Sequence, residues 1–170
     1  GNIIVPITGS HFAYIEVSWF FFSIGLVFWL VLLTIVLYRL FFHEPLPARL
    51  TPMLFILLAP PSVGFVSYSG LVGGLDNFGR VLYYIALFLS LLLFSNVLRF
   101  IRLPFFLSSW AYSFPVAALT IATKKMFMFT ALPLFNVLFV ALISILSLLV
   151  LWLVVRTCKA VIAGELCRPE

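Results

Sequence analysis

Residues 16–42 read EVSWFFFSIGLVFWLVLLTIVLYRLFF, a run whose charged residues, Glu16 and Arg39, lie near its two ends. A helix needs about 20 mostly apolar residues to cross about 30 Å of hydrocarbon at about 1.5 Å per residue. The run is long enough, and the aromatic residues at both ends are typical of membrane–water interfaces. It therefore predicts one complete membrane-spanning helix.

The composition of the whole chain extends this prediction. Hydrophobic residues make up 65% of the 170 residues, charged residues make up 9%, and 20 residues are Phe. Soluble domains contain roughly 45–50% apolar and about 25% charged residues, so these few charges could not cover a water-exposed surface. The sequence predicts an all-α, polytopic integral membrane protein embedded in the lipid bilayer. It excludes a disordered chain, a collagen, a nucleic-acid-binding protein and a disulfide-stapled secreted fold.

Further hydrophobic elements lie on both sides of this run. We expect the end of a helix within 1–12, then helices from Thr51-Pro52 to about Gly70, over 79–100, from Pro104 to Lys124-Lys125 and over 133–156. Thr followed by Pro is a typical helix start, with Thr as the N-cap. Residues 1–170 should form a single transmembrane domain with a tail over 157–170. Because the chain opens without Met and inside a hydrophobic element, we expect it to be a fragment that lacks its N-terminal portion.

The basic residues predict the orientation in the membrane. Seven lie on one side of the predicted spans and three on the other. The seven are Arg39, Arg49, Arg99, Arg102, Arg156, Lys159 and Arg168, and the three are Arg80, Lys124 and Lys125. Because cytoplasmic loops carry an excess of Lys and Arg, this distribution places the C-terminus in the cytoplasm. The net charge of +5 is thus a signal of topology, and the tail thiols Cys158 and Cys167 should be reduced.

Three prolines indicate an internal repeat. Pro6, Pro61 and Pro115 lie 55 and 54 residues apart, and each begins a Pro-x-x-small pattern that ends at Gly9, Gly64 or Ala118. The spacing equals one helix, its partner and two short loops. Self-similarity at a fixed period is typical of a repeat architecture. The chain therefore predicts repeated hairpins, each with one proline-interrupted helix and one continuous helix.

The interrupted helices should lie inside the protein. Proline removes a backbone hydrogen bond, and lipid cannot satisfy the carbonyl group that it frees. Pro115, and likewise the pair Pro60-Pro61, lies near the middle of its predicted span. Prolines at one depth favour a pathway between the inner helices; the alternative is that they only kink a packed bundle.

Chemistry-bearing side chains are scarce in the predicted spans. No Asp, Glu, Lys, Arg or His lies in the middle of a span, whereas coupled carriers usually need an ionisable relay there. There is no HExxH or GxSxG motif and no close Cys/His set, and His11 and His43 lie at span ends. We therefore expect no catalytic residue, no metal site and no cofactor.

Specific stretches resemble a known family. Residues 108–115 (SSWAYSFP), continuing to 121–123 (IAT), resemble the ninth helix of the TehA and plant slow-anion-channel family. Residues 59–64 (APPSVG) resemble its seventh helix, and residues 1–2 begin what resembles its fifth. Residues 42–47 (FHEPLP) favour the bacterial TehA branch. The match extends from one end of the chain to the other.

The resemblance implies an architecture. Family members have ten transmembrane helices arranged as five hairpins around a central pore, with the odd-numbered helices inside, and they assemble as homotrimers. This chain would hold the end of helix five and helices six to ten, in the inner membrane of a bacterium. The interrupted helices predicted from the prolines would then be helices five, seven and nine.

The resemblance also implies a gate. In the family, a phenylalanine of helix nine closes the pore midway, and the matching residue here is Phe114, directly before Pro115. A hydrophobic constriction of this kind gates by excluding water. Small residues at Gly9, Gly64 and Ala118 would keep the rest of the lumen open, and Pro6, Pro60, Pro61 and Pro115 would line or kink the pore.

The expected function is a gated channel for small inorganic anions such as chloride and nitrate. No ring of Arg or Lys lines the predicted pore, which favours anions that shed water easily and low discrimination among them. Two alternatives stay open. One is a carrier for C4-dicarboxylates or an exporter of tellurite oxyanions, and the other is a structural membrane subunit without a pore.

Overall fold

The computed structural model describes residues 2–9, 15–44, 47–97 and 105–163, and all its regular elements are helical. In chain order the 3₁₀-helices (η) and α-helices are η1 (Asn2–Ile4), α1 (Val5–Gly9), α2 (Ile15–Phe42), η3 (Ala48–Leu58), α3 (Ala59–Val72), α4 (Asn77–Ser95), η4 (Leu107–Tyr112), α6 (Ser113–Thr130) and α7 (Pro133–Ile162). A 3₁₀-helix directly precedes α1, α3 and α6. Four segments within the described ranges are long and apolar enough to cross a membrane: Ile15–Phe42, Leu50–Val72, Asn77–Ser95 and Pro133–Ile162. The prediction of an all-α, multi-pass membrane protein is confirmed.

Three helices lie on their predicted runs, and the structure corrects the predicted start of another helix and the predicted end of a fifth. Helices α2, α4 and α7 lie on the runs 16–42, 79–100 and 133–156, although α4 ends at Ser95 and α7 continues past Arg156 to Ile162, into the segment expected to be a tail. Thr51 is not an N-cap, because η3 begins earlier, at Ala48, and the Thr51 hydroxyl donates back to the Pro47 carbonyl at 3.2 Å.

The second correction concerns α6. This helix continues past Lys124 and Lys125 to Thr130 before it ends at Ala131, whose backbone is left-handed (φ 54°). The predictions made for His11, Arg99, Arg102, Pro104, Cys167 and Arg168 lie outside the described residues.

The turn between α3 and α4 forms where the sequence places it. Helix α3 ends at Gly73, whose backbone is left-handed (φ 72°), a conformation that glycine adopts without strain. Asp76 then caps α4 by accepting a hydrogen bond from the Gly79 N–H at 2.8 Å. The Tyr68 hydroxyl donates to the second carboxylate oxygen of Asp76.

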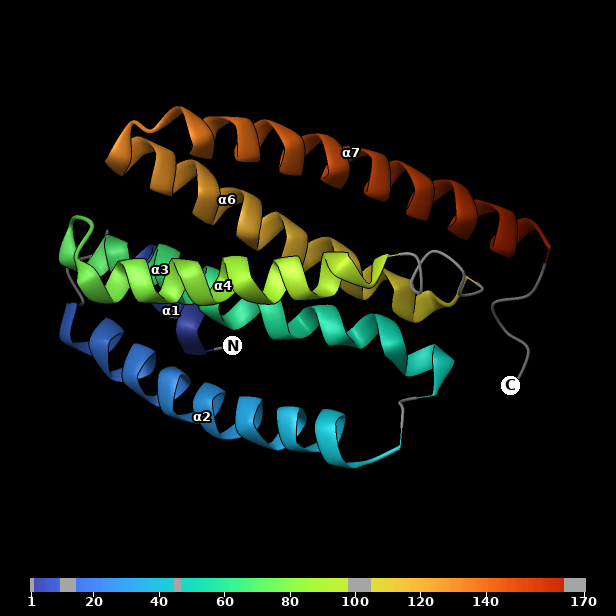
Figure 1. Cartoon of the computed structure of the whole chain (residues 1–170), viewed down its shortest axis with the longest axis horizontal. Helices are drawn as coiled ribbons and strands as arrows, with labels where there is room; N and C mark the ends of the chain where they lie inside the picture. Colours follow the sequence, from blue (N-terminus) through green and yellow to red (C-terminus); the bar gives the residue numbers. More distant parts are fainter. Residues whose placement is uncertain (1, 10–14, 45–46, 98–104, 164–170) are drawn as a thin grey trace.

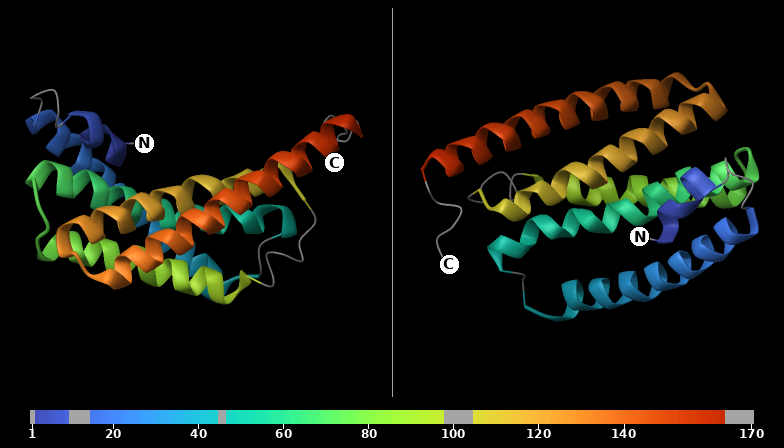
Figure 2. Two further views of the ribbon diagram at one scale, coloured as in Figure 1. Left: turned by 90° about the horizontal axis from the view of Figure 1, so that it is seen from above. Right: turned by 180° about the vertical axis from the view of Figure 1, so that it is seen from behind.

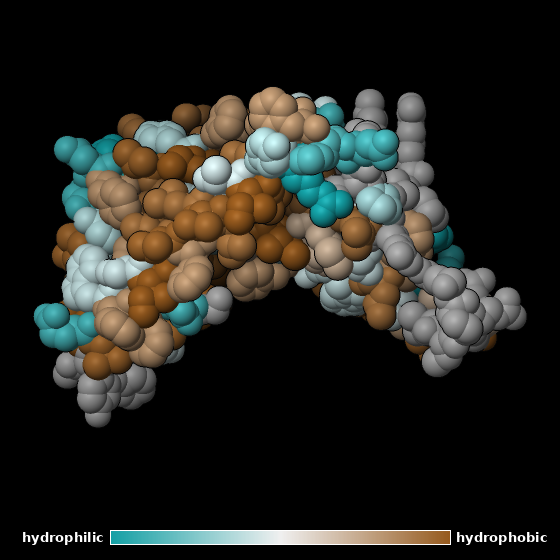
Figure 3. All heavy atoms as spheres, turned by 90° about the horizontal axis from the view of Figure 1, so that it is seen from below, coloured by the Kyte–Doolittle hydropathy of each residue, from teal (hydrophilic) through white to brown (hydrophobic). Residues whose placement is uncertain are grey.

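The helices form one curved layer with additions on both sides. Helices α2, α3, α6 and α7 follow one another across the layer, and α4 packs on α3 and α6 (Figure 1). The short α1 lies against α2 and α3 on the side away from α4 (Figure 2). Seen from the side of α2, the molecule is arched, and the surface that borders the hollow carries mostly hydrophobic residues (Figure 3).

Burial separates the helices into two kinds. In the most apolar 18-residue window, 11% of residues are buried in α2 and 11% in α7, against 61% in Leu50–Val72. The proline-bearing helices α3 and α6 carry eight buried residues each. For α2, α3, α6 and α7 this division agrees with the prediction that interrupted helices lie inside and continuous helices outside. The continuous helix α4 departs from it, because 39% of its most apolar window is buried.

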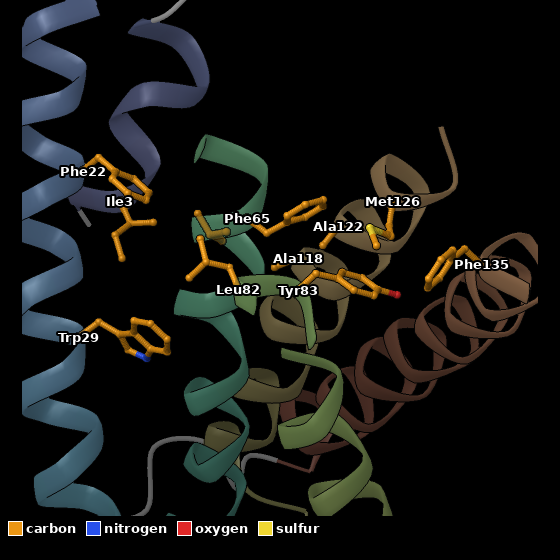
Figure 4. Close-up of a cluster of buried hydrophobic side chains, with 11 residues drawn as sticks. Ile3, Phe22, Trp29, Phe65, Leu82, Tyr83, Ala118, Ala122, Met126 and Phe135 are labelled. Atoms are coloured by element: carbon orange, nitrogen blue, oxygen red, sulfur yellow. The ribbon is translucent and has the colours of Figure 1, made fainter. Parts of the chain in front are cut away.

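The core joins α3, α4, α6 and α7 around Tyr83 of α4. Its ring is fully buried, with the centroids of Phe65 and Phe135 at 5.5 and 5.6 Å, and its hydroxyl donates to Thr123 Oγ1 at 3.2 Å (Figure 4). Edge-to-face and tilted aromatic pairs of this kind add to the stability that comes from burial. Helices α3, α4, α6 and α7 are therefore held around one side chain.

Candidate functional site

Each repeat proline stands just after a change of helix type. Pro6 is the second residue of α1, which follows η1; Pro61 is the third residue of α3, which follows η3; Pro115 is the third residue of α6, which follows η4. The first N–H groups of an α-helix have no partner within the helix, so proline costs little there. The sequence repeat thus corresponds to a structural repeat, a junction from 3₁₀-helix to α-helix in each inner helix.

At two junctions a serine hydroxyl donates to the carbonyl of the residue three positions before the proline. In a 3₁₀-helix this carbonyl would accept from the backbone N–H at the proline position, but proline has no N–H. Ser62 Oγ donates to the Leu58 carbonyl at 2.8 Å, and Ser67 Oγ donates to the Ile3 carbonyl. The second bond joins two inner helices that are 64 residues apart in sequence. Both serines are fully buried.

Phe114 lies at the third junction and is open to its surroundings. Its side chain is 54% exposed, whereas Pro115 and Val116, which follow it, are buried. The Phe114 side chain borders a cavity of about 720 Å³ whose wall includes Ala59, Pro60 and Val63 of α3. The structure therefore brings the predicted gate residue next to the proline junction of the neighbouring repeat.

The other wall of this cavity is formed by α2 and η1. Trp29 of α2 lines it, is 7% exposed, and has a buried indole N–H with no hydrogen-bond partner among the described residues. Arg39 lines the cavity near the C-terminal end of α2, and Asn2 lines it from η1. The remaining wall is almost entirely apolar, which is typical of a surface that sheds water.

The three predicted small residues lie at helix contacts. A Cβ atom at Gly9 would overlap the hydroxyl of Ser18 in α2, and a Cβ at Gly64 would touch Ile3 and Leu82 at 3.9 Å each. Ala118 is buried in the same core cluster as Tyr83. Pro6 and Pro61 are also buried, so among the predicted residues Phe114 and Pro60 are the two that border the cavity.

Sequence reasoning missed a close helix contact and a lysine. Gly25 of α2 lies so near η1 that a Cβ would stand 2.9 Å from the Ile3 nitrogen. Lys125 of α6, assigned to the membrane surface from sequence, donates from Nζ to the Val66 carbonyl of α3 at 3.0 Å and is partly buried. A glycine inside a hydrophobic run was the signal in the sequence for the close contact of Gly25. The sequence held no such signal for Lys125, because a pair of adjacent lysines looks like a membrane-surface pair.

The chain is similar in sequence to known anion channels. Residues 1–158 match the SLAC1 family, described as voltage-dependent anion channels. The chain is 32% identical over 157 residues to the S-type anion channel SLAH3 of Arabidopsis thaliana, covering 92% of this chain and 25% of the relative. It is 30% identical over 125 residues to the guard cell S-type anion channel SLAC1 of the same plant, covering 74% of this chain and 22% of the relative.

An archaeal relative is similar over a larger share of its own length. An uncharacterized transporter of Methanocaldococcus jannaschii is 24% identical over 192 residues, which cover all of this chain and 56% of the relative. The chain thus spans about a quarter of the length of the plant relatives. With the family match over residues 1–158, the chain belongs to the SLAC1 family of voltage-dependent anion channels.

Proposed function

We propose that this chain supplies the gate of an anion channel, in which Phe114 closes a central pore and moves to let small anions pass. The observation that carries the proposal is the position of Phe114. Its ring is 54% exposed on an inner helix whose neighbouring residues are buried, and it borders a cavity together with Pro60 of the next repeat.

The physical basis of the gate is the exclusion of water. An apolar ring across a narrow apolar lumen prevents a continuous file of water, and an anion cannot pass without one. The ring is neutral, so opening needs a change of rotamer or a shift of the backbone. Pro115 has no backbone N–H to donate, so the turn that holds Phe114 lacks a hydrogen bond that another residue could make there, at the point that must move.

The proposed substrates are chloride, nitrate and similar small anions. The cavity beside Phe114 offers a cationic donor at Arg39 and is otherwise apolar apart from Asn2 and the largely buried Trp29. Such a lumen binds anions weakly, which a conducting pathway requires because an ion must leave as readily as it enters. Discrimination should then follow the ease of dehydration rather than a tight binding site.

The surrounding assembly belongs to the same proposal. We expect a homotrimer in a bacterial inner membrane with the C-terminus in the cytoplasm, following the resemblance to TehA and the excess of basic residues on one side. Residues 1–170 would form a single domain corresponding to the end of helix five and helices six to ten. The broadly exposed apolar faces of α2 and α7 are suited to lipid or to other subunits.

The decisive experiment compares the wild-type whole protein with its Phe114→Ala variant in voltage-clamped membranes. If the ring blocks the path, the variant should carry a large anion current that the wild type lacks. Phe88→Ala is the matched control, because Phe88 is 63% exposed but lies on α4. It removes the same side chain and should leave the current unchanged.

The same recordings distinguish the alternatives. A Phe114→Ala variant that is folded, inserted and as silent as the wild type contradicts the gate. Flux that saturates with malate or tellurite, with no current in chloride, indicates the carrier. Equal currents for sodium and chloride contradict anion selectivity.

A further inference from the structure

Lys125 is a cation placed between two inner helices. It lies inside α6, five residues before the helix ends at Thr130, and its side chain is partly buried. Its ammonium group contacts two neutral groups, the Val66 carbonyl oxygen of α3 at 3.0 Å and the ring of Phe129 at 6.0 Å. Its charge is therefore held in place by contacts that do not neutralise it.

Helical geometry places Lys125 on the same face of α6 as the gate. Ile121 and Lys125 follow Phe114 by seven and eleven residues, close to two and three turns at about 3.6 residues per turn. Ile121 is 58% exposed, as open as Phe114 at 54%. At about 1.5 Å per residue, Lys125 stands roughly 16 Å from Phe114 along the axis. One stripe of α6 therefore carries the aromatic ring, an aliphatic residue and then a cation.

The ammonium group has donors left for a ligand. It carries three N–H groups, and the Val66 carbonyl accepts one of them. The same carbonyl also accepts from Ser69 Oγ at 3.2 Å, so it is bonded from two sides and holds the lysine at a fixed height on α3. A fixed, partly desolvated cation beside an apolar surface raises the local concentration of anions.

The adjacent lysine is arranged differently. Lys124 lies over the rings of Phe127 and Phe139 at 5.4 and 4.9 Å from their centroids, and Phe139 belongs to α7. Its charge thus faces the outer helix, away from α3. Because Lys125 contacts α3 and Lys124 contacts α7, a substitution of Lys125 can be compared with the same substitution of Lys124 as its control.

We propose that Lys125 is an anion-recruiting residue of the conduction path, on the side of Phe114 toward the C-terminal end of α6. Its ammonium group attracts small inorganic anions into a mostly apolar lumen and so sets both conductance and the preference for anions over cations. The inference rests on the proposed channel function. It adds a role to Lys125 beyond the interpretation from sequence, in which both lysines only orient the protein in the membrane.

The test uses the conducting Phe114→Ala protein as background and compares Lys125→Gln, Lys125→Arg and Lys124→Gln. In about 20 mM chloride, Lys125→Gln should reduce the anion current roughly three- to tenfold, and in about 1 M chloride less than twofold, because salt screens a single charge. The reversal potential should shift toward equal permeability for sodium and chloride. Lys125→Arg should retain the current of the background, and so should Lys124→Gln.

A second variant covers the case in which the loss of Lys125 disturbs folding. In a background without Cys158 and Cys167, Lys125→Cys is treated in the membrane with a positively or a negatively charged methanethiosulfonate reagent. The positive reagent should restore the current and the negative one should abolish it. Equal currents in all Lys125 variants, at both chloride concentrations and with both reagents, overturn this inference while leaving the gate intact. A silent Phe114→Ala background instead contradicts the proposed function itself.

Discussion

The hydroxyl of Ser67 in α3 donates a hydrogen bond to the backbone carbonyl of Ile3 in η1, across 64 residues of sequence. Ser67 is fully buried and Ile3 is 7% exposed, so the bond lies out of reach of lipid headgroups and water. It meets a carbonyl that Pro6 cannot bond in 3₁₀ geometry. One side chain thus holds the first inner helix to the second.

Replacement of this serine should therefore weaken the protein. Ser67→Ala leaves the buried Ile3 carbonyl without its side-chain donor, and we expect a loss of about 1–3 kcal/mol in the free energy of unfolding. Thermal unfolding in detergent measures it. Ser144→Ala is the control, since Ser144 is exposed on α7 and its hydroxyl bonds only within that helix, to the Val140 carbonyl at 2.8 Å. Equal losses in the two variants would show that the bond between the inner helices contributes nothing.

A second prediction concerns Gly25 of α2. A Cβ atom there would stand 2.5 Å from Ile3 Cγ1 and 2.9 Å from the Ile3 backbone nitrogen, and a backbone atom cannot rotate away. Gly25→Ala should cost about 1–3 kcal/mol by overpacking, although alanine is the better helix former. Gly74→Ala, where nothing lies within 4 Å, should leave the unfolding temperature unchanged. A Gly25→Ala protein as stable as the wild type would contradict the close contact between α2 and η1.

A third prediction concerns the core bond of Tyr83. Tyr83→Phe keeps the ring packing and removes the hydroxyl that donates to Thr123 Oγ1 at 3.2 Å, so the free energy of unfolding should fall by about 1 kcal/mol. Tyr84→Phe removes a hydroxyl from a neighbouring residue that is 48% exposed and should change it by less than about 0.5 kcal/mol. Chemical unfolding of both variants in one detergent gives the comparison. Indistinguishable curves would mean that the hydroxyl bond does not stabilise the core.

A fourth prediction concerns pH. The Gly79 N–H and then the Tyr68 hydroxyl, both donating to the Asp76 carboxylate, hold the pKa of Asp76 below its usual value. A group whose pKa is lowered on folding contributes stability above its unfolded pKa, and that contribution is lost as the pH falls through the folded pKa. The unfolding temperature of the wild type should therefore decrease with acidification below about pH 4.

Asp76→Asn supplies the comparison for this prediction. Its amide oxygen can still accept the Gly79 N–H bond but has no charge to titrate. The variant should be less stable than the wild type at neutral pH, and the difference should narrow on acidification. Parallel profiles for the two proteins would place the acid sensitivity elsewhere.

The sequence predicts the class of protein and the repeat well, because both rest on strong local signals. The run over 16–42 contains little besides apolar residues, and α2 occupies Ile15–Phe42. The proline spacing corresponds to the three helix junctions. The 3₁₀ geometry before each proline was not predicted, because the choice between i→i−3 and i→i−4 bonds depends on what packs around the helix.

The predicted end of α6 at Lys124-Lys125 was wrong for a physical reason. Two consecutive lysines usually mark a membrane surface, yet here the helix continues to Thr130. Lys125 is accommodated by the Val66 carbonyl and Lys124 by the aromatic rings of Phe127 and Phe139. The Val66 carbonyl of α3 and the Phe139 ring of α7 are brought near by tertiary packing, which a local pattern cannot reveal. The exposure of Phe114 likewise depends on how α6 is turned against α3, and it was expected only through the resemblance.

The junction between η4 and α6 has a geometric consequence for Phe114, the second residue of α6. A 3₁₀-helix advances about 120° and 2.0 Å per residue, and an α-helix about 100° and 1.5 Å. Each residue that crosses from one form to the other therefore turns the helix beyond it by about 20° and moves it by about 0.5 Å relative to the segment before it. If a few residues of η4 changed from 3₁₀ to α geometry, the Phe114 ring would therefore move around the helix axis while its own rotamer stays fixed.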